Sequence, residues 1–483
     1  MCTTFDNWGD SFAENAGLDG DGVIARVRIL CADHYDCVHS AVTTASVSID
    51  MHADIANDMR LARRELVAVQ RQKLAALFAA IRGDGHAYVG SAFYRNKFDG
   101  IAFDPSCDDL NALPPTTRAE LQANQQSHPP YGTILTCDVD AYVRFHQTSS
   151  TSGEPLRWPD TRANWDWWIR CWQFVLEGAG VTQKDRVVFP FSFGPFVGFW
   201  SAFDAACQRG CLCLPAGGMS SVARLKYIAD NYATVVCCTP TYALRLAEVA
   251  AAEGVDLSGL PVRALIVAGE PGGSIPATRD RIESAWGARV FDHVGMTEIG
   301  AWGFQTADYR DGVYVIESEF IAEVIDPKTL EPVDEGELGE LVLTNLGRLG
   351  SPLIRYRTGD LVRLTTEPGP DGVCFARVIG GVVGRSDDML VVRGNNVFPS
   401  AIEDVLRRFR EVAEYRITLL DDGPLNDLLV EIEIAEGENS PNGLCERVSD
   451  ALRLRLNFAP KVATVAANSL PRSEMKSRRV ARQ

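Results

Sequence analysis

The sequence lacks any long apolar run. No stretch of about 18 consecutive apolar residues occurs in it, and a bilayer-spanning helix needs roughly that many. The first residues, MCTTFDNWGD, also lack the basic segment and the apolar core of a secretory signal. We therefore expect neither a transmembrane helix nor a signal peptide, and we expect a cytoplasmic protein.

Basic residues are in deficit. The 483 residues include 47 Lys and Arg against 64 Asp and Glu, which gives a formal net charge of −17. Nonspecific binding to nucleic acid or to an anionic membrane requires a basic surface. The sequence therefore predicts no nucleic-acid partner and no membrane partner, although a locally basic site can still bind an anionic substrate.

The cysteines lack the even number and close spacing of a disulfide framework. There are 13 of them, spread over the chain, which is typical of reduced thiols. Five of them fall between residues 207 and 238, namely Cys207, Cys211, Cys213, Cys237 and Cys238. Most of these lie on strand-like runs, where buried cysteine acts as a small hydrophobic residue. A structural role is favoured, and a metal site is the alternative.

Apolar strands alternate with helical segments between residues 163 and 296. Strands are expected at Arg186–Phe191, Cys211–Leu214, Thr234–Cys238, Ala264–Ala268 and Arg289–His293. Helices are expected at Phe199–Gln208, Val222–Asn231, Tyr242–Ala252 and Ala277–Trp286. This alternation predicts an α/β fold with a mostly parallel sheet and helices on its faces.

The remaining segments differ in character. Residues 1–60 show no clear periodicity and are expected to be an N-terminal extension of unclear role. Helical spacing predicts a helix over Met59–Ile81. Short strands between residues 313 and 380 predict an antiparallel sheet or small barrel. Together with the α/β segment, these elements predict a large domain over residues 61–386. The GRSDDM segment breaks both periodic patterns, so we expect a small α+β domain over residues 387–483.

Two short motifs could bind a nucleotide at strand ends. The run TSSTSGEP at 148–155 follows a strand-like segment, and its hydroxyls and N–H groups can wrap phosphates. A solvated loop is the alternative. Gly269-Glu270-Pro271 follows the apolar run ALIVA, and ligands of open α/β sheets bind beyond the carboxyl ends of strands.

Two further motifs place a carboxylate after a strand or a turn. In GMTE, at 295–298, a hydroxyl and a carboxylate could hold a phosphate and Mg²⁺, or the acid could cap a helix. In YRTGD, at 356–360, the Asp could accept both hydroxyls of a ribose, or it could pair with an arginine in a turn. GRSDDM at 384–389 and PRSEMKSRR at 471–479 follow, and such a basic end is more often a solvated tail than a catalytic loop.

In this order the six motifs resemble those of the adenylate-forming superfamily, which includes acyl-CoA synthetases, peptide-synthetase adenylation domains and luciferases. The stretches YRTGD, GRSDDMLVVRG, CCTP and PRSE are most similar to the phenylacetate-CoA ligase branch. The resemblance spans roughly residues 65–480. It implies a large N-terminal adenylate-forming domain with a small mobile C-terminal domain, and ATP-dependent conversion of a carboxylic acid to an acyl-adenylate and then to a thioester, with coenzyme A as the expected thiol.

The resemblance also implies roles for individual residues. The β- and γ-phosphates would be held by Thr148, Ser149, Ser150, Thr151, Ser152 and Gly153. Gly269, Glu270 and Pro271 would line the adenine site, Asp360 would hold the ribose, and Arg385 would lie near it. Thr297 would contact the α-phosphate, Glu298 would bind Mg²⁺, and Lys476 would bridge the substrate carboxylate and the α-phosphate.

For the second half-reaction, the resemblance places a hinge at Asp387 and the thiol channel beside Gly394. The acyl pocket would be lined by Phe191, Phe193, Phe196, Gly217, Gly218, His293 and Gly295. Aromatic walls favour an aryl or arylacetic acid, and the alternative is that these phenylalanines belong to the core.

The sequence departs from the family pattern in its phosphate loop and in the segment after GMTE, and residues 1–60 do not align with the family. Ser150 stands where the phosphate loop usually has Gly, and Glu154 stands where it often has Lys. Thr306 and Tyr314 fall near positions where some relatives carry a metal-binding Cys and His. Because fold does not fix function, three alternatives are kept open: nitrite activation for diazotisation of an arylamine, loading of a carrier protein, and a non-catalytic relative. A homodimer is also compatible with the sequence.

Overall fold

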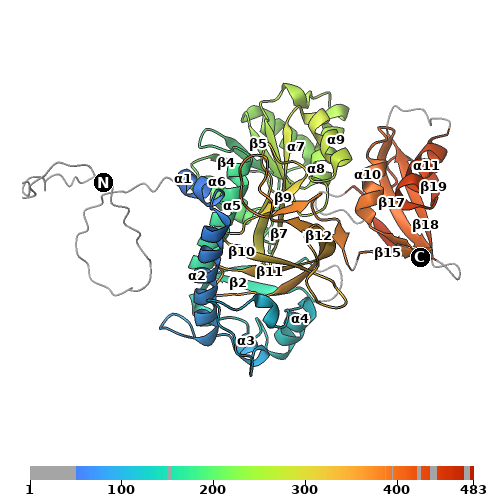
Figure 1. Cartoon of the computed structure of the whole chain (residues 1–483). Helices are drawn as coiled ribbons and strands as arrows, with labels where there is room; N and C mark the ends of the chain where they lie inside the picture. Colours follow the sequence, from blue (N-terminus) through green and yellow to red (C-terminus); the bar gives the residue numbers. More distant parts are fainter. Residues whose placement is uncertain are drawn as a thin grey trace, which may run out of the picture. The chain divides into compact units, whose positions relative to one another are not determined.

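The computed structural model describes residues 51–149, 154–386, 388–393, 395–420, 426–435, 443–472 and 479–482 (Figure 1). Within these residues, one sheet of twelve strands occupies the part of the chain up to Arg385. Two short ribbons, β1 (Tyr142–Gln147) with β2 (Arg157–Thr161) and β15 (Leu390–Val392) with β16 (Asn395–Val397), and one four-stranded sheet complete the strands.

Half of the large sheet is parallel. Its strands are β3 (Arg186–Phe189), β4 (Leu212–Pro215), β5 (Val235–Cys238), β6 (Ala264–Ala268) and β7 (Arg289–Met296), in the spatial order β4-β3-β5-β6-β7. The helices between them are α6 (Trp200–Gln208), α7 (Ser221–Asp230), α8 (Pro240–Ala252) and α9 (Pro276–Trp286). The predicted alternation of parallel strands and helices is confirmed.

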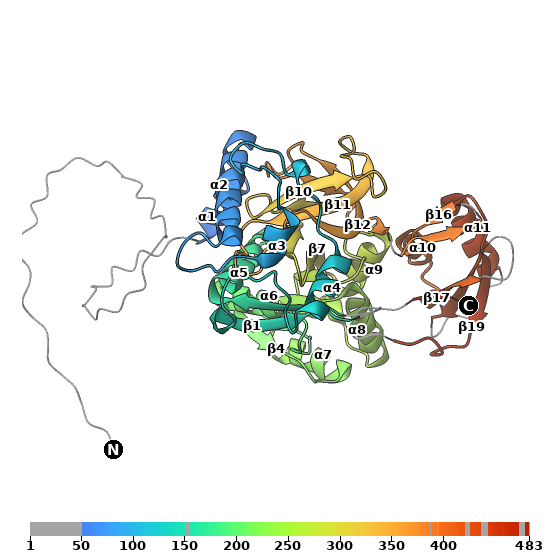
Figure 2. The same ribbon diagram turned by 90° about the horizontal axis from the view of Figure 1, so that it is seen from below.

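Side chains of the parallel strands alternate between two cores. Val187 and Ile266 pack with α6 and with α5 (Arg162–Gly178), whereas their neighbours Val188 and Leu265 pack with α7, α8 and α9. Helices α8 and α9 lie side by side (Figures 1 and 2). Burial on both faces explains why these strands are apolar at successive positions rather than at every second one.

The other half of the sheet is antiparallel. It continues from β7 through β8 (Gly300–Phe304), β9 (Gly312–Val315), β13 (Arg377–Ile379), β12 (Tyr356–Thr365), β11 (Leu338–Asn345) and β10 (Phe320–Ile325), and β14 (Gly384–Arg385) pairs with β12. The antiparallel sheet expected between residues 313 and 380 is therefore confirmed, and it is continuous with the parallel half.

Helices α1 (Met51–Asp58) and α2 (Arg63–Arg82) lie against this body (Figure 1). The buried carboxylate of Glu319 binds both Lys73 of α2, at 2.8 Å, and Arg170 of α5, at 2.7 Å. Arg170 also binds Asp54 of α1 at 2.9 Å. Helix α1 thus packs on the body although it falls within the stretch expected to be an extension. No helix in the described residues has both the length and the apolar composition needed to cross a bilayer.

Helix α4 (Arg118–Ser127) follows α3 (Ala92–Lys97) and begins directly after its capping residue Thr117. Thr117 Oγ1 accepts a hydrogen bond from the Glu120 N–H at 3.3 Å, and Glu120 accepts one from the Thr117 N–H at 2.7 Å. This reciprocal capping satisfies two backbone donors that the helix itself cannot. The cap fixes Arg118 as the first residue of the helix.

The C-terminal segment has its own α+β core. Its strands β17 (Val412–Leu420), β18 (Asp427–Ile434), β19 (Lys461–Val465) and β20 (Val480–Arg482) pair in the order β19-β18-β17-β20. Helices α10 (Pro399–Leu406) and α11 (Leu444–Leu456) contribute the remaining buried side chains. The predicted small α+β fold is confirmed (Figure 2).

Candidate active site

Two of the predicted motifs emerge at one edge of the parallel strands. β6 and β7 are paired neighbours, with Ala268 opposite His293, so the Gly269 and Gly295 motifs leave adjacent strands at their carboxyl ends. This is where open α/β sheets bind ligands. Glu270 is tied to the helix that precedes β6, because its Oε1 accepts a hydrogen bond from the Thr241 N–H of α8 at 2.9 Å.

The GMTE and YRTGD motifs meet at the carboxylate of Glu298. The Tyr356 hydroxyl donates to Glu298 Oε1 at 2.8 Å, and both side chains are buried. Burial, and then the neighbouring carboxylate, raise the pKa of Tyr356 well above its ordinary value. Tyr356 therefore stays protonated and remains a donor to Glu298.

Arg118 joins the first motif to the third. Its Nη2 donates to Thr148 Oγ1 at 2.9 Å, and its Nη1 lies 3.3 Å from Glu298 Oε1. Thr148 also accepts from the Leu156 N–H at 3.0 Å, and Ser149 follows it at the surface. No motif marked Arg118, since its only local signal in the sequence was a cation placed directly after a helix cap.

Arg348 fixes the backbone of the GMTE motif through hydrogen bonds. Its guanidinium donates to the carbonyls of Thr297 and Glu298 at 2.8 and 2.9 Å. Two more of its hydrogen bonds, at 2.7 and 2.6 Å, go to the carboxylate of Asp160 on β2. Both partners of this ion pair are almost fully buried. No local pattern marked Arg348, because its partners are distant in sequence.

Asp360 and Arg385 are brought together, as expected. They lie opposite each other where β12 pairs with β14. Arg385 Nη1 lies 3.3 Å from Asp360 Oδ1 and also 3.3 Å from the Thr358 carbonyl oxygen. The pair orients a buried carboxylate at the end of the YRTGD motif.

The expected acyl-pocket residues form an aromatic cluster. The rings of Phe191 and Phe193 are 5.6 Å apart in an edge-to-face arrangement, and Phe193 also contacts Trp200 of α6 at 4.7 Å. Both phenylalanines are half-buried, so each combines core packing with an accessible part. Phe196 is half-buried too but lies outside this ring cluster.

His293 is linked to the aromatic cluster through the rings of Trp172 and Phe199. Its ring lies 4.2 Å from that of Trp172, its Nδ1 is 2.7 Å from the Gly303 carbonyl oxygen, and burial lowers its pKa to about 4. It is therefore neutral near pH 7. The expected glycines differ in the space around them. At Gly295 a Cβ atom would come 3.0 Å from the Gly300 carbonyl oxygen and 3.4 Å from His293 Nε2. At Gly217 it would come 2.7 Å from the Phe191 carbonyl oxygen, whereas Gly218 has open space around it. Larger side chains at the first two positions would displace the backbone.

Thr306 and Tyr314 do not lie beside metal ligands. Both hydroxyls donate to one carboxylate, that of Asp371, with Tyr314 at 2.6 Å. In the described residues, His, Cys, Asp and Glu side chains nowhere gather in threes as a metal site. Cys211, Cys237 and Cys238 are buried, in line with the structural role favoured for the cysteine cluster.

Several expected site residues lie outside the described residues. They are Ser150, Thr151, Ser152, Gly153, Asp387, Gly394 and Lys476.

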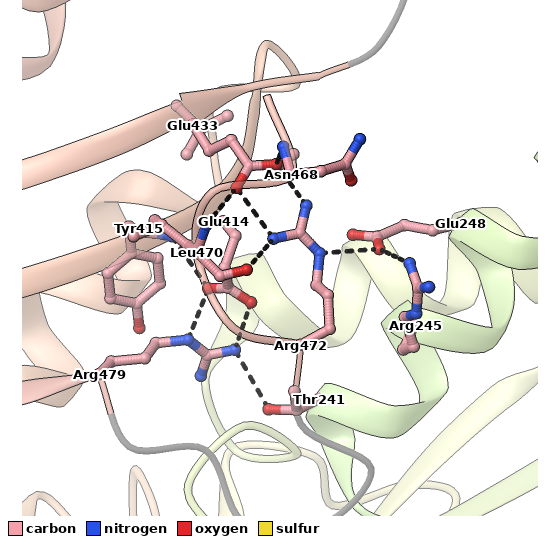
Figure 3. A network of polar contacts seen from close by, with 12 residues as sticks. Thr241, Arg245, Glu248, Glu414, Tyr415, Glu433, Asn468, Leu470, Arg472 and Arg479 are labelled. Carbon is pink, nitrogen blue, oxygen red and sulfur yellow. Dashed lines mark hydrogen bonds and ion pairs between the residues drawn. The ribbon is translucent and has the colours of Figure 1, made fainter. Parts of the chain in front are cut away.

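The residues that flank Lys476 in sequence are described, and they form the polar network of Figure 3. Arg472 binds Glu433 of β18 and lies 3.5 Å from Glu248 of α8. Arg479 binds Glu414 of β17 at 2.7 Å and Thr241 Oγ1 of α8 at 3.3 Å. The network thus connects the C-terminal sheet to the residue whose N–H binds Glu270.

Comparisons with known proteins agree with this geometry. Residues 137–347 match the family model described as AMP-binding enzyme, and residues 394–483 match the one described as AMP-binding enzyme C-terminal domain. The chain is 32% identical to phenylacetate-coenzyme A ligase of Pseudomonas putida over 81% of this chain and 90% of the relative. It is 30% identical to the ligase of that name from Escherichia coli (strain K12), over 86% and 94%.

Solved structures of 2-hydroxyisobutyryl-CoA ligase are also similar. In its postadenylation state with an adenylate, that ligase matches with a TM-score of 0.79 at 28% identity, over 87% of this chain and 89% of the other. In its thioesterification state, with an adenylate and CoA, the TM-score is 0.66.

Proposed function

The chain belongs to the family of AMP-binding enzymes, and from that premise we propose that it activates a carboxylic acid with ATP and transfers the acyl group to coenzyme A. The observation that carries the proposal is the buried carboxylate of Glu298, at which two nucleotide-binding motifs meet through the Tyr356 hydroxyl. Similarity to a phenylacetate-coenzyme A ligase over 90% of that relative supports it.

The reaction has two steps. An oxygen of the substrate carboxylate attacks the α-phosphorus of ATP, the bond to the bridging oxygen breaks, and pyrophosphate leaves. The thiol sulfur of coenzyme A then attacks the acyl carbonyl carbon, loses its proton, and AMP leaves. The first step replaces a poor leaving group by a good one, which is why ATP is consumed.

The nucleotide would be bound by residues that follow β1 and β6 and by residues of β12 and β14. We assign the adenine site to Gly269, Glu270 and Pro271, the ribose to Asp360 with Arg385 beside it, and the β- and γ-phosphates to residues 148–153. The pairing of β6 with β7 and of β12 with β14 supports this assignment, because the first places the Gly269 motif beside the Gly295 motif and the second places Asp360 opposite Arg385. Lys476 would stabilise the charge that builds up at the α-phosphate in the transition state.

A magnesium ion fits the residues around Glu298. Mg²⁺ usually binds one or two protein carboxylates and keeps its other positions for water and phosphate oxygens. Glu298 supplies one oriented carboxylate, whose backbone is fixed by Arg348, and the Thr297 hydroxyl is adjacent in sequence. Magnesium bound there would neutralise charge on the phosphates.

We propose an aryl or arylacetic acid as the substrate. The edge-to-face pair Phe191–Phe193 and the neutral His293 give an apolar surface suited to a planar ring. Such a rigid surface favours a rigid ring over a flexible alkyl chain, which would lose more conformational entropy on binding.

The thioester step would use the small domain over residues 387–483, with Asp387 as the hinge and Gly394 beside the thiol channel. The two states of 2-hydroxyisobutyryl-CoA ligase, which match this chain with different TM-scores, support a change of shape between half-reactions. The diazotase and carrier-loading alternatives gain no support, since the two relatives described above, at 32% and 30% identity, are coenzyme A ligases.

The test is a panel of acids assayed by pyrophosphate release and by acyl-CoA formation. Benzoate and phenylacetate analogues should outperform octanoate. Lys476→Ala should reduce adenylation by roughly 10²–10³, the usual loss for one transition-state donor, and should spare thioester formation from supplied acyl-adenylate. A preference for octanoate would overturn the aryl assignment alone. Absence of acid-dependent pyrophosphate release with every acid would overturn the function.

A further inference from the structure

The phosphate loop of this chain lacks the cation that such loops often carry. Its position 154 holds a glutamate with an exposed side chain where relatives often have lysine. A carboxylate beside the β- and γ-phosphates of ATP would repel them, because like charges at short range oppose binding. A protein cation from elsewhere in the structure would offset this repulsion and act together with the magnesium ion.

Helix α4 lies along the segment that follows the loop. Gln122 Nε2 donates to the Glu154 carbonyl at 2.7 Å. Gln125 donates to the Arg157 carbonyl at 2.8 Å and accepts from the Arg157 N–H at 3.0 Å. Arg118, Gln122 and Gln125 lie on one face of the helix because they are spaced by four and three residues. These bonds fix the register of α4 against the loop.

The same register brings the Arg118 guanidinium to the start of the loop. It binds Thr148 Oγ1 at 2.9 Å and lies 3.3 Å from Glu298 Oε1, and its side chain is 33% exposed. An arginine has five N–H donors, and its contacts within the described residues use two of them. The guanidinium therefore stands between Thr148, which precedes the rest of the phosphate loop, and the proposed magnesium ligand Glu298, it is open to solvent, and not all of its donors are used by contacts among the described residues.

We propose that Arg118 binds the β- and γ-phosphates of ATP, and the pyrophosphate formed from them, in place of the missing loop lysine. This inference rests on the proposed function only in taking ATP as the ligand. A planar guanidinium can bind phosphate oxygens through two parallel hydrogen bonds. The N-terminal turn of α4, which carries Arg118, adds a favourable partial positive charge at that end of the helix.

The experiment measures MgATP binding calorimetrically without any acid, and then ATP–pyrophosphate exchange. Arg118→Ala should weaken MgATP and pyrophosphate binding about tenfold or more, the effect of losing a charge-assisted pair of hydrogen bonds, and should leave the KM for the acid within about twofold. Arg118→Lys should lose less. The double change Arg118→Ala with Glu154→Lys should recover part of the loss, because it restores a cation in the loop.

Arg310→Ala is the matched control. Arg310 has the same 33% exposure and pairs with Glu283 away from the phosphate loop, so its loss should leave MgATP affinity unchanged. Unaltered MgATP affinity in Arg118→Ala, or an equal loss in Arg310→Ala, would overturn the inference. If the wild-type protein binds MgATP but activates no acid, the proposed function fails while the Arg118 test still decides. A wild-type protein that does not bind MgATP would overturn both.

Discussion

Arg348 shows how much of the site depends on a single buried residue. It holds the carbonyls of Thr297 and Glu298 and is neutralised by Asp160. Arg348→Ala would leave a buried carboxylate uncompensated, which costs about 3–5 kcal/mol of stability. It should also release the GMTE backbone. We therefore expect both a lower free energy of unfolding and a higher Mg²⁺ concentration for half-maximal pyrophosphate exchange.

The chain offers a control for Arg348. Arg355 is similarly buried, binds Glu323 at 3.0 Å, and also donates to backbone carbonyls, of Asn111 and Leu113. Arg355→Ala should lower stability by a comparable amount without changing the Mg²⁺ requirement. Equal shifts in the Mg²⁺ requirement of both variants would show that Arg348 has a structural role only.

Asp292 provides a pH-dependent prediction at the same scale. Burial raises its pKa to about 6, although the Ser274 hydroxyl donates to it at 2.5 Å. An acid whose pKa is raised by folding holds its proton more tightly in the folded state, so stability is lost as pH rises from about 4 to about 6. Asp292→Asn removes this dependence. The variant should gain stability relative to wild type over that range, by up to about 3 kcal/mol.

Urea denaturation of both proteins at pH 4 and at pH 7.5 measures the effect. Comparing the variant with wild type at each pH cancels the contributions of other titrating groups. A difference between the two proteins that is the same at both pH values would contradict the raised pKa of Asp292.

At the scale of elements, the strands and helices could be predicted because their signals are local. Where the end of an element differs from its predicted position, the structure shows the reason. Helix α8 begins at Pro240 rather than Tyr242, since Thr239 caps it and proline suits the first turn. Strand β7 extends to Met296, because Gly295 and Met296 pair with the antiparallel β8. Such pairing depends on a partner strand and is not visible in the sequence of β7.

The candidate site could be predicted in part for the same reason. Glu298, Asp360 and Glu270 belong to contiguous motifs, whose order in the chain was sufficient to indicate a nucleotide site. Arg118 and Arg348 belong to no motif. Arg118 lies 180 residues from Glu298 in sequence, and Arg348 lies 188 from Asp160. Their roles depend on tertiary contacts, which a single sequence does not reveal.

The Asp371 cluster gives a prediction about loops that join strands. Asp371 accepts hydrogen bonds from Tyr314 of β9 and from Thr306 after β8. Asp371→Ala would leave these hydroxyls without their acceptor, at a cost of about 1–3 kcal/mol. Asp371→Asn, which keeps one acceptor oxygen, should cost less. Thermal unfolding of both variants beside the wild-type protein measures these differences. Equal melting temperatures of Asp371→Ala and the wild-type protein would contradict this view.

At the scale of the whole molecule, contacts between the C-terminal sheet and α8 bear on how the two half-reactions alternate. Arg472 and Arg479 each bind a glutamate of the C-terminal sheet and also a residue of α8 (Figure 3). The α8 contacts are long, at 3.5 and 3.3 Å, whereas those within the sheet are shorter. The Arg472–Glu248 pair is partly exposed, with side-chain exposures of 19% and 33%, and such a pair contributes about 0–1 kcal/mol. This contact can therefore break at little cost if the small domain turns.

If the small domain turns, restricting its hinge should slow one half-reaction selectively. Proline fixes φ near −65°, so Asp387→Pro should keep the chain close to one arrangement, while Asp387→Ala retains free rotation. We expect the proline variant to form acyl-adenylate at close to the normal rate. It should convert supplied adenylate to thioester about tenfold more slowly or worse, a barrier increase of about 1.4 kcal/mol. The alanine variant should perform both steps. Stopped-flow and quench measurements of each half-reaction test this prediction. Equal slowing of both steps in the proline variant would show that Asp387 is not the hinge.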